Sequence, residues 1–372
     1  MSKQAKRQFF RRILAAVAVV ALCVALPALP LDWNGLVRQA ACLSAGIRQP
    51  YGAASMMEQS LFNQPAAPVD TTLTAPADPS HQWNGADTGL LDLPAAAPAV
   101  TLPEILLIDP PGNKKNGGKI VTRKMNTGNR AKNGIATVNR SGKKEDIPAA
   151  LTAELTQTFE NTDAPQVLIL HTHTTEGYMT YDGGYYNDGD RDRTRDHRKS
   201  VVAVGEAIRL TLAAAGITAI HDTTIHDQPQ YSGAYGRSAD TAAAILEKYP
   251  TIKVVLDIHR DAILEDGAVV KPTATVAGKP AAQMMLITGT VDTKALPHPR
   301  WRENLALSTH LQAALDKVSP DLMRPLNTVA SRYSQHLSSG WVLVEVGAEG
   351  NTVAEAVYSG QILARTLAQL LD

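Results

Sequence analysis

A short apolar run that ends abruptly in metal-competent side chains limits what this chain can fold into. Residues 167–170 read Val-Leu-Ile-Leu and are followed by HTHTTEGY at 171–178. Such a bounded run predicts a buried strand of a parallel sheet, and the ligand crevice of an open α/β sheet lies beyond the carboxyl ends of its strands. His173 and Glu176 are three residues apart. If the chain turns into a helix after the strand, this spacing puts both on one face, within reach of one Zn²⁺.

Two further segments repeat this pattern. Residues 253–261 (KVVLDIHRD) form a second apolar run that ends at His259 among charges. Residues 341–347 (WVLVEVG) carry Glu345 inside an apolar strand, where a carboxylate is costly unless something pairs with it. An H-x-x-E pair alone is common by chance. Two histidines at strand ends, a glutamate three residues on and a buried carboxylate together indicate a mononuclear zinc hydrolase.

The second half of the chain alternates strands and helices. The segments with helical character are 200–215, 238–249, 302–317 and 352–371, and apolar strands lie between them. This alternation predicts one α/β domain of about 220 residues, with a mostly parallel central sheet flanked by helices. A long polar connection at 181–199 predicts a binding loop or lid. A second, at 221–237, carries His221 and His226, which either take part in the site or reflect the polarity of the loop.

The first hundred residues predict a membrane anchor and a tether. Five basic residues in 1–12 precede an apolar run at 13–31, which is long enough to cross a bilayer and keep its basic flank in the cytoplasm. A cleaved signal peptide is the alternative. Residues 32–100, rich in Ala, Pro, Ser and Asp, predict a disordered, extracytoplasmic linker. We expect 101–150 to be an N-terminal extension and 151–372 to be the catalytic domain.

Composition argues against two kinds of protein. Lys and Arg match Asp and Glu at 36 each, so the formal net charge of zero provides no field of one sign for nucleic acid. The two cysteines, Cys23 and Cys42, lie in or just after the apolar run. They form no useful disulfide framework and supply no ligand to the metal site.

From about residue 147 to the C-terminus, the chain resembles the stage II sporulation protein P family. The segments that carry the resemblance are HTHTTEGY (171–178), HDTTIHDQPQYSGAYGRS (221–238), LDIHRDA (256–262), RYSQH (332–336) and EVGAEGNT (345–352). The anchor and the long linker also fit the membrane-bound layout of that family. Two positions depart from the family pattern, Ser200 and Ser334, where the family has Asn.

The resemblance implies a zinc-dependent peptidoglycan hydrolase, related in fold to N-acetylmuramoyl-L-alanine amidases and more distantly to zinc carboxypeptidases. It would cleave the amide between N-acetylmuramic acid and L-alanine, and also stem-peptide cross-links, during septal thinning and engulfment in sporulation. Its place would be the septal membrane, beside the lytic transglycosylase known as stage II sporulation protein D.

The residues themselves suggest how the roles divide. We expect His173, Glu176 and His259 to hold Zn²⁺ with a water in the fourth position, and Glu345 to act as the general base. His171 stays open as an alternative first ligand, because residues 171 and 173 of a strand point to the same side. The spacing to Glu176 favours His173.

Other polar residues are candidates for binding substrate. Arg260 could steady a developing oxyanion or a substrate carboxylate, with a salt bridge to Asp257 or Asp261 as the alternative. The remaining substrate-binding candidates are Gln283, Gln335, His336 and His226.

Two other functions fit the same residues. A zinc peptidase that acts only on stem peptides would attack an amide by the same chemistry. A non-catalytic wall-binding scaffold on the same fold should have lost a ligand or the base, whereas all four residues are present in this sequence.

Overall fold

The computed structural model describes residues 103–111, 116–125, 127–128, 134–191 and 193–372. The predicted tail, anchor and linker (1–12, 13–31 and 32–100) lie outside the described residues. Within the described ranges, none of the helices combines the length and the apolar character that a membrane span requires.

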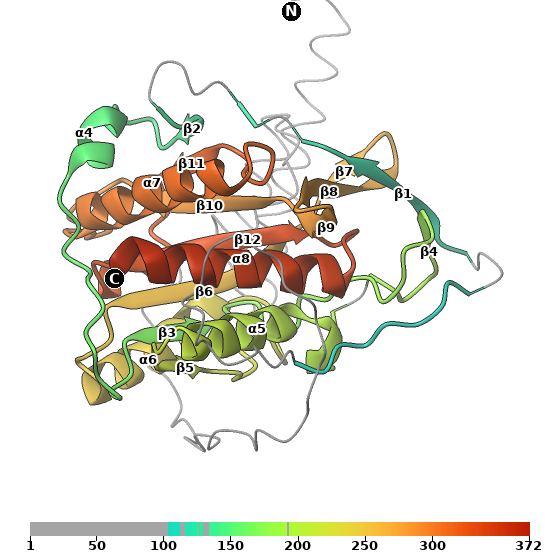
Figure 1. The fold of residues 1–372 in the computed structure, drawn as a ribbon, viewed down its shortest axis with the longest axis horizontal. Coiled ribbons are helices and arrows are strands. Elements are labelled where there is room, and N and C mark those ends of the chain that lie inside the picture. The colour runs from blue at the N-terminus through green and yellow to red at the C-terminus, as the bar shows by residue number, and fades with distance from the viewer. Residues whose placement is uncertain (1–102, 112–115, 126, 129–133, 192) are drawn as a thin grey trace, which may run out of the picture. The chain divides into compact units, whose positions relative to one another are not determined.

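Two sheets and the helices around them organise this part of the chain (Figure 1). The seven strands of the larger sheet are, in spatial order, β2 (Thr137–Arg140), β11 (Leu326–Val329), β10 (Met284–Gly289), β12 (Trp341–Ala348), β6 (Val254–Asp261), β3 (Val167–Leu170) and β5 (Ala219–His221). The smaller sheet has the order β4 (Tyr185–Tyr186), β1 (Gly118–Arg123), β8 (Ala268–Val276) and β7 (Leu264–Glu265), and β9 (Lys279–Ala282) pairs with β8. The helices are α4 (Ile147–Thr152), α5 (Val201–Ala214), α6 (Ala234–Lys248), α7 (Trp301–Val318) and α8 (Val353–Leu371), with 3₁₀ turns η2 (His197–Lys199) and η3 (Gln335–Leu337).

The larger sheet is mixed, so the prediction of a mostly parallel sheet was wrong. β12, β6, β3 and β5 run in one direction. β10, β11 and β2 are parallel to one another, but β10 is antiparallel to β12, so this second group runs the opposite way. The cause lies between β6 and β10, where β7, β8 and β9 form successive antiparallel pairs in the smaller sheet. The chain therefore re-enters the larger sheet in the reverse direction.

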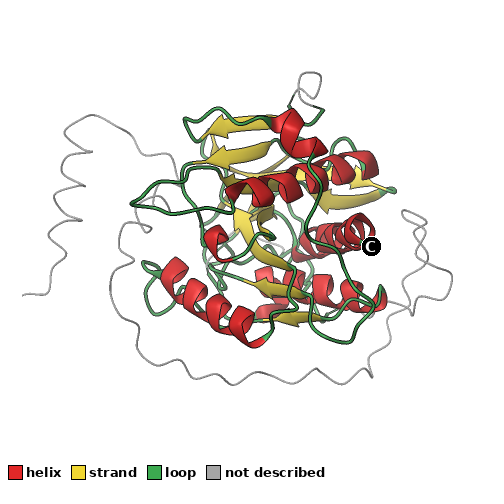
Figure 2. Ribbon diagram, turned by 90° about the vertical axis from the view of Figure 1, so that its left-hand side faces the viewer, coloured by secondary structure: helices red, strands yellow, loops and turns green. Residues whose placement is uncertain are grey.

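Alternation along the strands divides the larger sheet into two differently covered faces. Ile169 and Leu256 belong to the main core, which they share with apolar residues of α5, α7 and α8. Their neighbours Leu168 and Val255 point the other way and pack against α6. The long helices α5, α7 and α8 lie side by side across one face (Figure 1), and Figure 2 shows the sheets and helices from the side. His259 alternates with Leu256 and Ile258 along β6, so its side chain projects from the face that carries α6.

Local signals fix the beginnings of α5 and α8. The Ser200 side chain accepts a hydrogen bond from the Val202 backbone N–H at 3.3 Å and so caps α5. The helix ends just before Gly216, whose φ of +79° is the left-handed conformation that commonly terminates a helix. Helix α8 begins with a capping box between Thr352 and Glu355.

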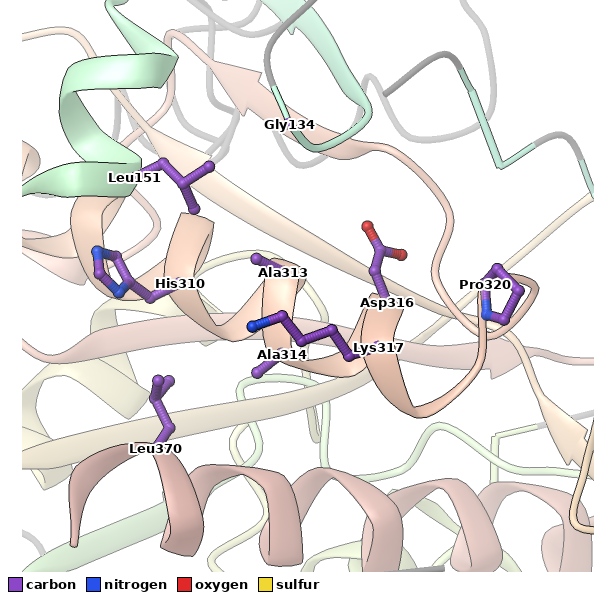
Figure 3. A pocket seen from close by; sticks show the side chains of 9 residues that line it. All are labelled: Gly134, Leu151, His310, Ala313, Ala314, Asp316, Lys317, Pro320 and Leu370. Atoms are coloured by element: carbon purple, nitrogen blue, oxygen red, sulfur yellow. The ribbon is translucent and has the colours of Figure 1, made fainter. Parts of the chain in front are cut away.

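A hollow lies on the outer side of α7, between this helix, α4 and α8. Leu151, His310, Lys317 and Leu370 are among the side chains that line it (Figure 3). The residues around it come from helices and their connections rather than from the carboxyl ends of β3 and β6. It therefore does not coincide with the metal-competent side chains.

Candidate metal centre

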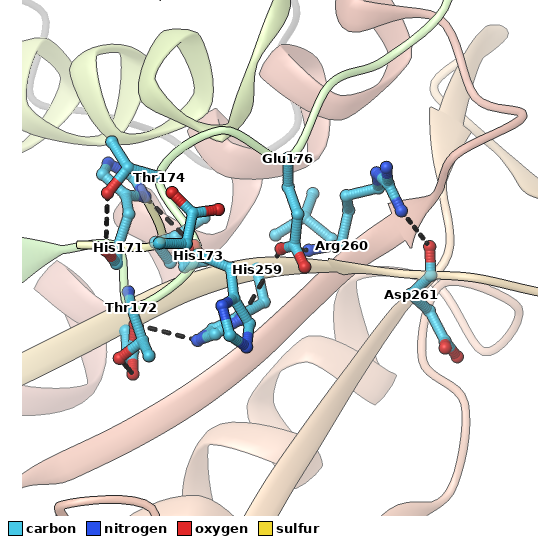
Figure 4. Close-up of polar contacts among 12 residues, drawn as sticks. His171, Thr172, His173, Thr174, Glu176, His259, Arg260 and Asp261 are labelled. Atoms are coloured by element: carbon cyan, nitrogen blue, oxygen red, sulfur yellow. Dashed lines mark hydrogen bonds and ion pairs between the residues drawn. The ribbon is translucent and has the colours of Figure 1, made fainter. Parts of the chain in front are cut away.

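Three buried side chains converge where β3 and β6 end. Strand β3 ends at Leu170, and the Glu176 backbone N–H donates to the His173 carbonyl at 3.0 Å, so a turn rather than a helix closes the H-x-x-E spacing. This turn brings His173 and Glu176 to His259, which β6 supplies (Figure 4). One ligand atom from each lies within 4.8 Å of the other two. We call His173, Glu176 and His259 the metal cluster.

The metal cluster is electrostatically arranged for a cation. His259 Nδ1 lies 3.6 Å from Glu176 Oε2, and His259 Nε2 lies 2.9 Å from Asp257 Oδ1 without the alignment of a hydrogen bond. Burial alone would lower the pKa of His259, but the carboxylates of Asp257 and Glu176 raise it well above its usual value. Burial lowers the pKa of His173 to about 3, so this imidazole stays neutral and keeps a lone pair.

The donor set fits a zinc ion. Among the described residues, His173 Nδ1 has no hydrogen-bond partner although it is buried. The pKa of Glu176 is held far below its usual range despite burial, chiefly by His259, so a carboxylate faces the two imidazoles. Two imidazoles and one carboxylate are ligands of catalytic zinc sites, which keep one position for water or substrate. The Asp257 carboxylate behind His259 is the kind of partner that orients a ligating histidine.

Glu345 lies next to the metal cluster on β12. It is in register with His259 on the adjacent strand, so both side chains project from the same face of the sheet. Burial, followed by the nearby Asp261 carboxylate, raises the pKa of Glu345 to about 8. Its Oε2 is buried and makes no hydrogen bond to the part of the chain that the structure describes. A carboxyl group poised near neutral pH can both accept and return a proton.

His171 lies apart from the metal cluster. Its Nδ1 is 3.0 Å from the Ile258 carbonyl oxygen and its Nε2 is 2.9 Å from Nε2 of His221, whose Nδ1 is 3.1 Å from Glu206 Oε2. We call His171, His221 and Glu206 the His171 network. The expectation that residues 171 and 173 share a face does not apply, because the strand ends at Leu170 and the chain turns. The structure therefore brings His173, and not His171, to Glu176 and His259.

Most of the described chain matches a known protein family. Residues 110–368 match the family described as stage II sporulation protein P (SpoIIP). The chain belongs to the stage II sporulation protein P family. No curated protein matches the chain.

Three solved structures to which this member of the stage II sporulation protein P family is similar are described as amidases. The apo N-acetylmuramyl-L-alanine amidase Ami1 from Mycobacterium abscessus is 15% identical, with a TM-score of 0.31 over 56% of this chain and 100% of that one. AmiC2 of Nostoc punctiforme is 14% identical, with a TM-score of 0.33 over 55% of this chain and 94% of that one. The CwlD amidase from Clostridioides difficile, solved with the GerS lipoprotein, is 13% identical, with a TM-score of 0.33 and the same coverages.

Arg260 of this family member turns its guanidinium away from the metal cluster. Its Nε donates to the Gly177 carbonyl at 2.8 Å and its Nη1 to the Asp261 carbonyl at 3.3 Å, as Figure 4 shows for the latter. The acidic side chain near it is Glu349, at 3.6 Å, rather than Asp257 or Asp261. The backbone N–H of Arg260 donates to Glu176 Oε2 at 3.1 Å. The residue thus orients a predicted ligand through its backbone, and its side chain is engaged elsewhere.

Three of the four predicted substrate-binding residues hold backbone segments. Gln283 bonds Met125 N and Asp321 O, and Gln335 bonds Gly289 N and Ile287 O. His226 Nδ1 lies 2.9 Å from the His171 carbonyl oxygen, and its Nε2 lies 3.1 Å from Thr241 Oγ1.

His336, the fourth, is partly exposed. Burial, followed by Arg332, lowers its pKa to about 4. Within the described ranges, the metal-competent group does not include any of these four residues.

Among the side chains that the sequence analysis did not single out, Tyr231 and Arg193 reach the metal cluster. Tyr231 stacks on His173 with ring centroids 4.4 Å apart, and its hydroxyl lies 3.0 Å from His173 Nε2. Arg193 Nη2 lies 3.5 Å from Glu176 Oε1. Both belong to the long polar segments 181–199 and 221–237, whose length was the only sequence signal for them.

Proposed function

We propose that the chain is a zinc-dependent N-acetylmuramoyl-L-alanine amidase that acts on peptidoglycan during sporulation. Membership of the stage II sporulation protein P family supports the setting and the hydrolase class. The observation that carries the chemistry is the buried metal cluster, with an unsatisfied His173 Nδ1 and the unsatisfied carboxyl of Glu345 beside it. Cleavage of stem-peptide cross-links by the same site is part of the proposal, because it breaks the same type of bond.

His173, Glu176 and His259 would hold the zinc ion. When bound, zinc supplies a Lewis acid that polarises the scissile carbonyl and acidifies water. Asp257 holds His259 in place from behind, and the Arg260 backbone N–H holds the Glu176 carboxylate. These contacts fix the ligand side chains before substrate arrives.

Glu345 would manage the proton. It accepts a proton from water as the water oxygen bonds to the scissile carbonyl carbon, and it passes that proton to the amide nitrogen as the carbon–nitrogen bond breaks. The products are the carboxylate of muramic acid and a stem peptide with a free N-terminal L-alanine. Burial raises the pKa of Glu345 towards neutral pH, which brings this carboxyl closer to the range in which a group can exchange protons with water.

The cellular setting is proposed on sequence and family grounds. The apolar run at 13–31 would anchor the chain in the septal membrane with its catalytic domain outside the cytoplasm. The partner that the family resemblance implies is the lytic transglycosylase stage II sporulation protein D. Protease access to the C-terminal domain in intact protoplasts tests the orientation, since a cytoplasmic domain would be protected.

The deciding experiment measures zinc content and the release of free stem peptides from purified peptidoglycan by the full-length chain. We expect about one zinc per chain in the wild type and in Glu345→Gln, and none in His259→Ala. Both variants should be inactive, and the exposed control Glu247→Gln on α6 should behave as the wild type. Shortened cross-links without free stem peptides would show a peptidase instead. An active Glu345→Gln or a zinc-free active wild type would refute the mechanism, and a zinc-free inactive wild type would favour the wall-binding scaffold.

A further inference from the structure

One arginine beside the metal cluster has a guanidinium edge directed at the site. Arg193 Nη1 pairs with the Asp227 carboxylate and also lies 3.5 Å from Thr175 Oγ1. Its Nη2 lies 3.5 Å from Glu176 Oε1, at the long limit of a hydrogen bond. The side chain is 34% exposed, whereas the three residues of the metal cluster are 5% exposed or less. Arg193 therefore connects the buried centre with solvent.

The surroundings of Arg193 hold its side chain in one position. Asp227 is fixed by Thr175, which donates from its backbone N–H at 3.3 Å and from its hydroxyl at 2.6 Å. The guanidinium lies 4.5 Å from the centroid of the Tyr231 ring, and that ring stacks in turn on His173. A guanidinium held by an ion pair and an aromatic ring loses little further freedom when a ligand binds to its remaining edge.

The other arginines of the same segment are directed elsewhere. Arg191 pairs with Glu349 and lies over Tyr186. Arg198 pairs with Asp196 and Glu104. Arg195 contacts Gln228 at an exposed position. The side chain of Arg260 is also turned away from the site. Arg193 is therefore the arginine placed to bind a substrate carboxylate, which is one of the two roles that the sequence suggested for Arg260.

We propose that Arg193 binds a carboxylate of the substrate, namely the α-carboxylate of the D-glutamate that follows L-alanine in the stem peptide, an assignment that rests on the proposed function. A carboxylate oxygen that accepts from Nη2 lies about 2.9 Å from it. Since Nη2 itself lies 3.5 Å from Glu176 Oε1, a carboxylate bound to Nη2 lies at most about two residues of extended peptide, at about 3.3–3.6 Å each, from this side chain of the metal cluster. The first free carboxylate beyond the scissile amide belongs to the second residue of the stem. Guanidinium and carboxylate match in charge and in planar geometry.

The test compares two soluble glycan–peptide fragments whose D-glutamate carries either a free α-carboxylate or its carboxamide. We expect the wild type to prefer the carboxylate by roughly 10- to 100-fold in kcat/KM, since a hydrogen bond to a charged partner is lost with the carboxamide. Arg193→Gln should lose this preference while it still cleaves both fragments. The matched control Arg195→Gln, from the same segment, should keep it. Arg193→Lys should restore part of the preference because it keeps the charge and loses the planar fork.

Measurements of substrate binding distinguish recognition of the carboxylate from a role of Arg193 in the chemical step or in holding zinc. In a Glu345→Gln background, which should hold substrate without turnover, Arg193→Gln should weaken binding of the carboxylate fragment and leave the carboxamide fragment unchanged. Equal discrimination by wild type and Arg193→Gln overturns the assignment. An equal loss of kcat on both fragments also overturns it, since Arg193 would then act on the developing oxyanion, and so does loss of zinc from Arg193→Gln. If the wild type cleaves neither fragment, the proposed function itself fails.

Discussion

Two clusters that contain histidine lie close to the end of β3, and they differ in how their polar atoms are satisfied. In the metal cluster, buried His173 Nδ1 finds no hydrogen-bond acceptor or donor in the described part of the chain, and the carboxylate of Glu176 faces imidazoles. In the His171 network, each ring nitrogen of His171 and His221 has a partner at 2.9–3.1 Å. The first cluster keeps a buried donor atom without a partner, as a candidate metal site would, whereas every ring nitrogen of the second cluster has a partner.

The His171 network also fixes the tautomer of His171. The Ile258 carbonyl can only accept, so His171 Nδ1 donates to it, and burial holds the pKa of His171 well below its usual value, which keeps Nε2 as an acceptor facing His221 Nε2. His221 Nδ1 lies 3.1 Å from the Glu206 carboxylate. Similar residue types thus form the His171 network, which lies against α5, and the metal cluster, which lies on the opposite face of the sheet. Neighbouring partners, rather than residue type, separate the two roles.

Removing one histidine from each cluster in turn gives the largest expected difference between the two clusters. His173→Ala should lose zinc and lower kcat/KM by about 10³-fold or more, because it removes a ligand and the charge stabilisation that zinc provides. His171→Ala should keep zinc and most activity. Its free energy of unfolding should fall by about 2–3 kcal/mol, because it leaves the buried Nε2 of His221 unpaired.

Zinc content, initial rates and urea unfolding of both variants check this prediction. A zinc-free His171→Ala that unfolds as the wild type would assign the first ligand to His171 and contradict the comparison.

The sequence predicted the composition of the metal cluster better than the fold around it. Strand ends that carry His and an H-x-x-E spacing are local signals, so His173, Glu176 and His259 could be named without knowing their neighbours. The choice between His171 and His173 depended on where β3 ends, which a period of two residues cannot locate. Arg193 and Tyr231 lie on long connections whose path depends on tertiary contacts, so periodicity could not place them.

The reversed strand direction did have a sequence signal that was overlooked. Asp266-Gly267 between β7 and β8 adopts φ of 49° and 77°, and Ala277-Gly278 between β8 and β9 adopts 46° and 75°. Positive φ at both central residues is typical of two-residue hairpin turns, and an Asp-Gly pair between short strands predicts one. Recognising this hairpin would have interrupted the strand–helix alternation and predicted a mixed sheet.

Gly205 of α5 tests how tightly the His171 network is packed. A Cβ at this position would lie 2.5 Å from His221 Nε2 and 2.7 Å from His171 Nε2. Because both rings are held by hydrogen bonds, Gly205→Ala should lower the free energy of unfolding by about 1–3 kcal/mol, despite the better helix propensity of Ala. Urea unfolding measures this. An unchanged or higher stability would show that the network has room to move.

Tyr231→Phe tests the outer contact of the metal cluster. The change keeps the ring that stacks on His173 and removes the hydroxyl that lies 3.0 Å from His173 Nε2. Loss of a partner that orients a ligating histidine should weaken zinc affinity about tenfold. Competition with a zinc chelator measures the affinity, and Tyr249→Phe at the end of α6 is the matched control. If both variants bind zinc as the wild type does, Tyr231 does not orient His173.

The smallest expected effect concerns the charge that completes the His171 network. Burial alone would raise the pKa of Glu206, but hydrogen bonds from His221 and Arg209 lower it from 4.5 to about 2. Between these two values the unfolded chain binds more protons than the folded one, so this contribution to stability is complete above pH 4.5 and disappears as the pH falls towards 2. Since the carboxylate is partly exposed, Glu206→Gln should cost about 1–2 kcal/mol at pH 7.

The stability curves of wild type and Glu206→Gln should therefore converge on acidification, whereas the exposed control Glu247→Gln on α6 should run parallel to the wild type. Urea midpoints measured from pH 7 to pH 3 give the two slopes. Curves of wild type and Glu206→Gln that stay parallel over this range would mean that His221 and Arg209 do not hold Glu206 as a carboxylate. Glu206 would then contribute no charge to the His171 network, and the contrast between this network and the metal cluster would lose its electrostatic basis.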